Sequence, residues 1–229
     1  MERHFVQELQ SLKELLLMMG GRTEAIVRKS IESLRRRDPA LAEQVFADDR
    51  AIDRLEIDVE ERCIRLLALQ QPLASDLRFI TAALKISNDL ERAGDHAVNI
   101  AGGAQRLAGT PDAKPRVDIP RMADCAVGML HESLDAFVRR DAESARRLVR
   151  RDDEVDELNR QMFRDLLGSM IEDPSTIPRA MELVLVARNL ERIADLATNV
   201  AEEVVFIAEA RIIKHHADES AAGEDFGRS

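Results

Sequence analysis

The segment NDLERAGDHAVN, residues 88–99, has a near copy one hundred residues later, RNLERIADLATN, residues 188–199. When both segments are extended by two residues, seven of 14 positions are identical. Each copy contains an acid, a second acid four residues on, and an asparagine four residues further. This spacing is that of one helical face, and its repetition raises the question of what the oxygen-rich face does.

Two further pairs of segments repeat at an offset of 103, so the duplication extends over most of the chain. LRRRD (34–38) matches FVRRD (137–141), and DRAIDRL (49–55) matches DDEVDEL (152–158). The offset then falls to 100, which places a three-residue deletion in an inter-helix turn. Agreeing offsets of this size indicate two large units rather than a short solenoid repeat.

The composition is typical of an all-helical protein: 33% of the 229 residues are charged, Gly and Pro are few, and Trp and Tyr are absent. We therefore predict an all-α fold of two tandem three-helix bundles, with six long antiparallel helices. The expected helices cover residues 5–37, 39–69, 73–101, 121–140, a fifth from a cap at Asp141 to a break at 172–178, and 179–214. Asp38 is expected to cap the second helix, Gly20-Gly21 is a candidate kink in the first, and Gly102-Gly103 is expected to end the third.

These breaks define the expected domains. Residues 1–106 form the first bundle, 107–120 a linker rich in Pro and Gly, 121–216 the second bundle, and 217–229 a disordered acidic tail.

Charge and composition exclude several kinds of protein. A net charge of −10 and a scarcity of aromatic residues argue against nucleic acid as a partner. Cys63 and Cys125 have no CxxC spacing, so they are expected to be reduced thiols rather than a disulfide or a zinc site. No segment contains the roughly 18 uninterrupted apolar residues of a membrane span, and the N-terminus does not resemble a signal peptide. A cytoplasmic protein is therefore expected.

The carboxylates repeat on two helices of each unit. Positions four apart share a helical face, so each of the four predicted stripes begins with a pair of acids. These pairs are Asp49 and Asp53, Glu91 and Asp95, Asp152 and Asp156, and Glu191 and Asp195. Glu56 and Glu60 extend the first stripe, whereas Asn159 and Phe163 stand at the matching positions of the second unit.

Like charges at this spacing repel, so a positive partner is expected. One interpretation is an ion-pair face, neutralised by Arg50, Arg54, Arg92 and Arg192. The other is a multivalent cation, which the apolar surroundings of Glu191 favour because a partly buried carboxylate is costly without a partner. Oxygen ligands without His or Cys favour a hard ion such as Fe(III), Mn(II) or Mg(II) over structural zinc.

The motifs DRAID, ERAGD, DDEVD and ERIAD, with HFVQEL (4–9) and PLASDLRFI (72–80), resemble the PhoU family of phosphate-signalling proteins. The resemblance covers the chain except the tail after about His216. It implies multinuclear metal clusters, iron first and Zn, Mn or Mg as alternatives, held by Asp49, Asp53, Glu91 and Asp95 in one unit and Asp152, Asp156, Glu191 and Asp195 in the other.

The resemblance also implies a function. PhoU-like proteins are negative regulators of phosphate uptake and of the phosphate-starvation response, between a phosphate ABC transporter ATPase and a sensor histidine kinase. They commonly form homodimers and touch membrane complexes only peripherally. No catalytic constellation is visible, so we expect a protein that is not an enzyme. The alternatives are a carboxylate-bridged di-metal enzyme, disfavoured by the lack of Glu-x-x-His spacing, and a metal-free helical interaction module.

Overall fold

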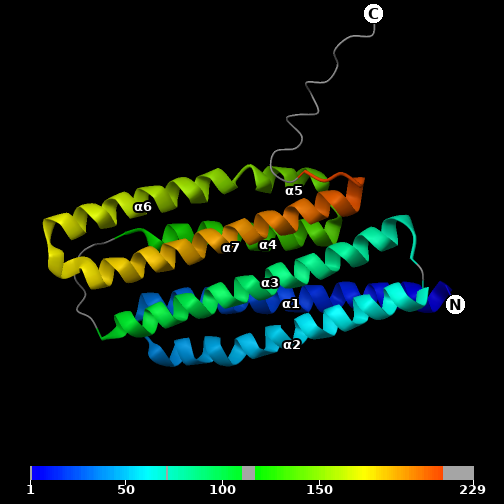
Figure 1. The fold of residues 1–229 in the computed structure, drawn as a ribbon, viewed down its shortest axis with the longest axis horizontal. Helices are drawn as coiled ribbons and strands as arrows, with labels where there is room; N and C mark the ends of the chain where they lie inside the picture. The colour runs from blue at the N-terminus through cyan, green and yellow to red at the C-terminus, as the bar shows by residue number, and fades with distance from the viewer. Residues whose placement is uncertain (1, 71, 110–116, 214–229) are drawn as a thin grey trace, which may run out of the picture.

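A computed structural model describes residues 2–70, 72–109 and 117–213, and all of the regular structure in these ranges is helical. Two bundles lie side by side along the long axis of the molecule (Figure 1). The helices are α1 (Glu2–Arg36), α2 (Pro39–Gln70), α3 (Ala74–Ala108), α4 (Ile119–Arg139), α5 (Ala142–Val149), α6 (Asp152–Glu172) and α7 (Ile177–Glu209), with a 3₁₀ turn η1 (Pro174–Thr176) before α7. The predicted all-α fold of two tandem bundles is confirmed.

Helices α3 and α7 form the centre of the molecule. They run antiparallel, with α1 and α2 packed on α3, and α4, α5 and α6 packed on α7 (Figure 1). Their polar contacts follow the antiparallel register: Lys85 meets Glu203, His96 meets Asn189, and Arg106 meets Glu182. One continuous apolar core joins the two units, and buried apolar residues of both central helices belong to it.

Helix α3 does not end at Gly102-Gly103, as the sequence suggested, but continues to Ala108. A Cβ at position 103 would lie 3.2 Å from Val186 Cγ2 on α7. The absence of a side chain there allows α3 and α7 to approach closely, so this glycine serves helix packing rather than helix termination.

The fifth predicted helix is divided at Arg150-Arg151 into α5 and α6, which is a second correction. Neither Gly nor Pro marks this turn. At this turn the Arg151 side chain forms an ion pair with Glu132 on α4, with 2.6 Å between Nη1 and Oε2. As a result, Asp152 lies in the first turn of α6, where the helix dipole favours a carboxylate.

Other helix limits agree with the sequence, with one exception. Asp38 and Asp141 cap their helices through backbone amides of Ala40 and Ser144. Helix α1 runs through Gly20-Gly21 without interruption. Helix α7, however, ends at Glu209 rather than Lys214, because Ala210 adopts a left-handed conformation with φ of 59°. The centre of the predicted linker, 110–116, and the predicted tail, 217–229, lie outside the described residues.

Both cysteines are free thiols. Cys63 is buried in the core and Cys125 is half-buried, in agreement with the expectation. None of the described helices combines the length and hydropathy needed to cross a lipid bilayer.

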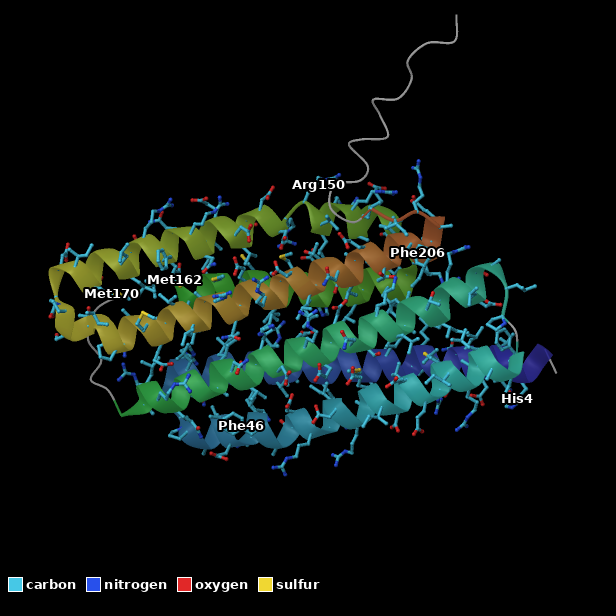
Figure 2. The ribbon with its side chains drawn as sticks, in the orientation of Figure 1. His4, Phe46, Arg150, Met162, Met170 and Phe206 are labelled. Atoms are coloured by element: carbon cyan, nitrogen blue, oxygen red, sulfur yellow. The ribbon has the colours of Figure 1, made fainter. Side chains whose placement is uncertain are left out.

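Lys85 joins the two units at the α3–α7 contact. Its Nζ lies 3.0 and 3.1 Å from the two carboxylate oxygens of Glu203, whose side chain is only 2% exposed. The same Nζ lies 5.4 Å from the centre of the Phe206 ring, labelled in Figure 2 near the end of α7. A buried carboxylate thus depends on a lysine from the other unit.

We predict that Lys85→Met lowers the free energy of unfolding by about 2 kcal/mol, because the buried Glu203 carboxylate then loses the two contacts and the positive charge of Lys85. Lys85→Met/Glu203→Met should be more stable than the single variant, since the buried negative charge of Glu203 is gone as well. Urea denaturation of both variants measures this. Arg139→Met, which removes an exposed pair with Asp135, is the control and should change stability by no more than about 0.5 kcal/mol. A double variant no more stable than Lys85→Met would contradict the prediction.

Candidate metal centres

The structure brings together all four carboxylates predicted in the first unit. Asp49 and Asp53 project from α2, and Glu91 and Asp95 from the neighbouring face of α3. Burial, together with the charges of Asp53 and Asp95, raises the pKa of Asp49 to about 6. Burial, together with the charges of Asp95 and Glu56 above all, raises the pKa of Glu91 to about 7. The four groups, with Glu56, form one mutually repelling cluster.

The first cluster has no basic side chain paired with it among the described residues. Within residues 2–70, 72–109 and 117–213, neither a lysine nor an arginine forms an ion pair with its four predicted carboxylates. Arg92, a candidate partner of Asp95, turns to Asp89 instead, with 3.6 Å between Nη1 and Oδ1. The ion-pair interpretation therefore does not account for this cluster.

Gly94 holds the first cluster close to the backbone of α3. A Cβ at this position would lie 3.0 Å from Asp49 Oδ1, a tighter contact than ordinary van der Waals packing allows. The absence of a side chain at position 94 leaves room for the Asp49 carboxylate close to α3. Ala194 occupies the matching position in the second unit.

The second cluster is assembled in the same way from α6 and α7. Burial, with the charges of Asp195 and Asp156, raises the pKa of Asp152 to about 6. Asp152 Oδ1 is buried and forms no hydrogen bond within the described residues, although the Thr198 hydroxyl opposes part of the rise in the pKa of Asp152. Burial also raises the pKa of Asp195, although a hydrogen bond from Arg192 opposes the shift. Three of the four predicted carboxylates thus share one site, and one of their oxygens lacks a partner.

The two clusters differ in two respects. Arg192 Nη1 lies 2.8 Å from Asp195 Oδ2, so the second cluster already has one positive neighbour. Glu191 is half-buried one turn earlier on α7, but it makes no hydrogen bond or ion pair with another described residue. The second unit therefore has the weaker demand for a cation.

His96, next to Asp95, does not belong to the first cluster. It points to α7, where its Nδ1 lies 2.9 Å from Asn189 Oδ1. This agrees with the 100° rotation between neighbouring positions of a helix. His96 connects the two units instead of contributing a ligand.

The donor set fits a hard cation, because every group is a carboxylate and one buried oxygen is unsatisfied. In the part of the chain that the structure describes, no three of these side chains already converge on a single point as metal ligands do. Carboxylates that share a site without a counter-charge repel one another, so a spread arrangement is expected. A cation has to draw them together by side-chain rotation on two fixed helices.

Comparison with known proteins identifies the family. The sequence matches the PhoU domain twice, over residues 16–103 and 119–204, one match in each helical unit. The chain belongs to the PhoU family.

Several PhoU relatives cover nearly the whole chain. A protein of Aquifex aeolicus named phosphate-specific transport system accessory protein PhoU homolog is 44% identical over 209 residues, 91% of this chain and 95% of that protein. A Caulobacter vibrioides homolog of the same name is 42% identical over 205 residues, 89% of each chain. The crystal structure of PhoU from Pseudomonas aeruginosa has a TM-score of 0.87 at 37% identity and covers 90% of this chain and 100% of that one. The phosphate transport system regulatory protein PhoU from Streptococcus pneumoniae has a TM-score of 0.85 at 28% identity, with 91% and 98% covered.

The predicted membership of the PhoU family is therefore confirmed. The names of these relatives describe accessory and regulatory proteins of phosphate transport rather than enzymes.

The raised pKa values generate a prediction about pH. Asp49 and Glu91 have ordinary pKa values of 3.8 and 4.5 and folded values of about 6 and about 7, so the folded state binds protons more tightly than the unfolded state. Their contribution to stability is present below about pH 4 and is lost as the pH rises through about 7. We predict that Asp49→Asn/Glu91→Gln, compared with the wild type in chelator, gains relative stability as the pH rises from 4 to 8.

Urea denaturation at each pH measures this difference, in which the titration of groups distant from the cluster cancels. Asp135→Asn, at an exposed pair on α4, is the control and should show no such trend. A difference between the double variant and the wild type that stays constant from pH 4 to 8 would contradict the electrostatic description of the cluster.

Proposed function

We propose that this protein is a cytoplasmic negative regulator of phosphate uptake and phosphate-starvation signalling, and that it has no enzymatic activity of its own. In this proposal it is a homodimeric, metal-binding scaffold that contacts the ATPase of a phosphate ABC transporter and a phosphate-sensing histidine kinase. Membership of the PhoU family, and the naming of its relatives as transport accessory proteins, support the association with phosphate transport.

The observation that carries the metal-binding part is the first carboxylate cluster, which has four acids and no basic partner in the described part of the chain. Asp49, Asp53, Glu91 and Asp95 would hold the ions of one multinuclear cluster. Asp152, Asp156, Glu191 and Asp195 would hold the other. Iron is the first candidate, with Mn, Mg and Zn as alternatives, because the ligands are all oxygen atoms. The ions would supply positive charge that cancels the repulsion between neighbouring helices.

A partner-binding face lies next to the second cluster. Three apolar residues at four-residue spacing on α6 and three on α7 are 42–74% exposed: Phe163, Leu167, Ile171, Ile177, Met181 and Leu185. We call these six residues the α6–α7 face. Helices α6 and α7 run antiparallel and side by side, so the two stripes lie close together (Figure 1). Exposed apolar patches of this extent are typical of protein interaction sites.

The α6–α7 face and the second cluster share one side of α6. Phe163 follows Asp156 by seven residues, which is two helical turns, so the apolar stripe continues the acidic one. A cation at Asp152 and Asp156 would reduce the negative charge at the edge of the face. This gives a direct route by which metal binding would favour partner docking.

The Gly94 contact generates a prediction about cation binding. Gly94→Ala should raise helix propensity by up to about 1 kcal/mol, yet the new Cβ displaces the Asp49 carboxylate. We predict a folded protein whose affinity for Mn(II) in the first unit falls by roughly tenfold or more. Calorimetric titration with Mn(II) measures it. Gly21→Ala is the control, because a Cβ at that position meets nothing within 4 Å. Unchanged Mn(II) affinity in Gly94→Ala would remove Asp49 from the ligand set.

The regulatory role predicts a change in gene expression. Deleting the gene from its host should raise phosphate-starvation gene expression in phosphate-rich medium, and the wild-type gene should restore repression. A Leu167→Glu gene should fail to restore it, because a charge in the α6–α7 face weakens binding of the transporter ATPase by about thirtyfold or more.

Ile64→Glu is the matched control for this experiment. Ile64 occupies the position equivalent to Leu167 in the first unit and is 55% exposed, but it lies outside the α6–α7 face. Its gene should restore repression fully. Unchanged starvation-gene expression after deletion would refute the regulatory role, whereas equal behaviour of the two glutamate variants would refute only the docking face.

A further inference from the structure

A cavity of about 340 Å³ lies at the end of the molecule where α1 and α3 end and α4 and α7 begin. Its apolar floor includes Leu34, Leu107, Ile119 and Leu183. Leu107 follows Asp95 by twelve residues, or roughly 18 Å of helix, and Leu183 precedes Glu191 by eight, or roughly 12 Å, so the cavity is separate from both carboxylate clusters.

The internal duplication shows what is unusual about this cavity. The residues equivalent to Leu34 and Arg179 in the other unit are Phe137 and Phe79. Those two rings stack with their centres 5.9 Å apart and an interplanar angle of 17°, and both side chains are buried. The twin position is thus filled by an aromatic pair, whereas here a leucine and an arginine leave a hollow and add a positive charge.

Three arginines line the hollow: Arg35, Arg37 and Arg179. Arg35 binds Glu32, and Arg37 and Arg179 each take part in another interaction within the chain. A guanidinium group has five N–H donors, so it can donate hydrogen bonds to a protein partner and to a ligand at the same time. Nε and Nη1 of Arg179 are buried without a hydrogen bond. Clustered guanidinium groups in a protein of net charge −10 favour an anion at this place.

We propose that this cavity binds a small amphipathic organic anion. Its apolar body would lie on the leucine and isoleucine floor, in the place that Phe79 and Phe137 fill in the twin, and its carboxylate, sulfonate or phosphate would bind the guanidinium groups. The volume is at the lower end of the range of about 300–1,000 Å³ found for small-molecule sites. The inference does not depend on the carboxylate clusters or on the regulatory role.

The test uses 8-anilinonaphthalene-1-sulfonate, a fluorescent anion with an apolar body, titrated into the full chain. We expect a saturable site whose affinity falls by roughly tenfold or more in Arg179→Met, which keeps the bulk but removes the charge. Leu34→Phe/Arg179→Phe should rebuild the aromatic pair of the twin and abolish the site. Arg22→Ala, at an exposed position of α1, is the charge-matched control and should bind as the wild type does.

Leu167→Glu identifies any probe bound to the α6–α7 face, and circular dichroism confirms that each variant is folded. Equal probe binding by the wild type and folded Arg179→Met would overturn the proposal, even if the double phenylalanine variant did not fold.

Competition then defines the ligand. Octanoate should displace the probe at concentrations at least tenfold lower than 1-octanol, and inorganic phosphate should not displace it. If 1-octanol displaced the probe as well as octanoate does, the pocket would be an apolar site without anion selectivity. If phosphate displaced it as well as octanoate does, the pocket would be a simple anion site. Either result would overturn the assignment of an amphipathic anion.

Discussion

Helix α3 packs against α1, α2 and α7 at once, and this constraint fixes where its functional side chains lie. With 3.6 residues per turn, Glu91 and Asp95 must face α2 if Leu90 and Ala97 are to face the core and His96 is to face α7. The carboxylates therefore meet those of α2 whatever their mutual repulsion. The core holds them there, and burial, followed by the charges of the neighbouring acids, raises the pKa values of Asp49 and Glu91. A bound cation is the simplest way to relieve this repulsion without moving the helices.

The duplication supplies an internal comparison, since the same architecture has been built twice with different side chains. The first unit has Gly94 and a carboxylate cluster that no lysine or arginine of the described ranges pairs with. The second has Ala194, and Arg192 bound to Asp195. The two ends of the molecule also differ. A stacked Phe79–Phe137 pair fills one end, and an arginine-lined cavity opens at the other. The two units thus share one framework but differ in the side chains at these positions.

Much of this could be predicted from sequence because it depends on local periodicity. The six helical segments, the duplication and the pairs of acids four residues apart all follow from spacing along one helix. What the sequence could not show depends on a second helix. Gly103 packs against Val186 on α7 instead of ending α3. Gly94 leaves space for the Asp49 carboxylate of α2. The turn at Arg150-Arg151 contains no Gly or Pro that would mark it in the sequence. Arg92 has two acids within reach along its helix, Asp89 and Asp95, and in the folded protein it pairs with Asp89.

The central claim is that the repeated carboxylates are cation sites, and metal content tests it most directly. Full-length protein purified without chelator should be compared with Asp95→Ala/Asp195→Ala by elemental mass spectrometry. The account predicts two or more equivalents of metal per chain in the wild type and their loss in the variant. A wild-type protein without bound metal would contradict it.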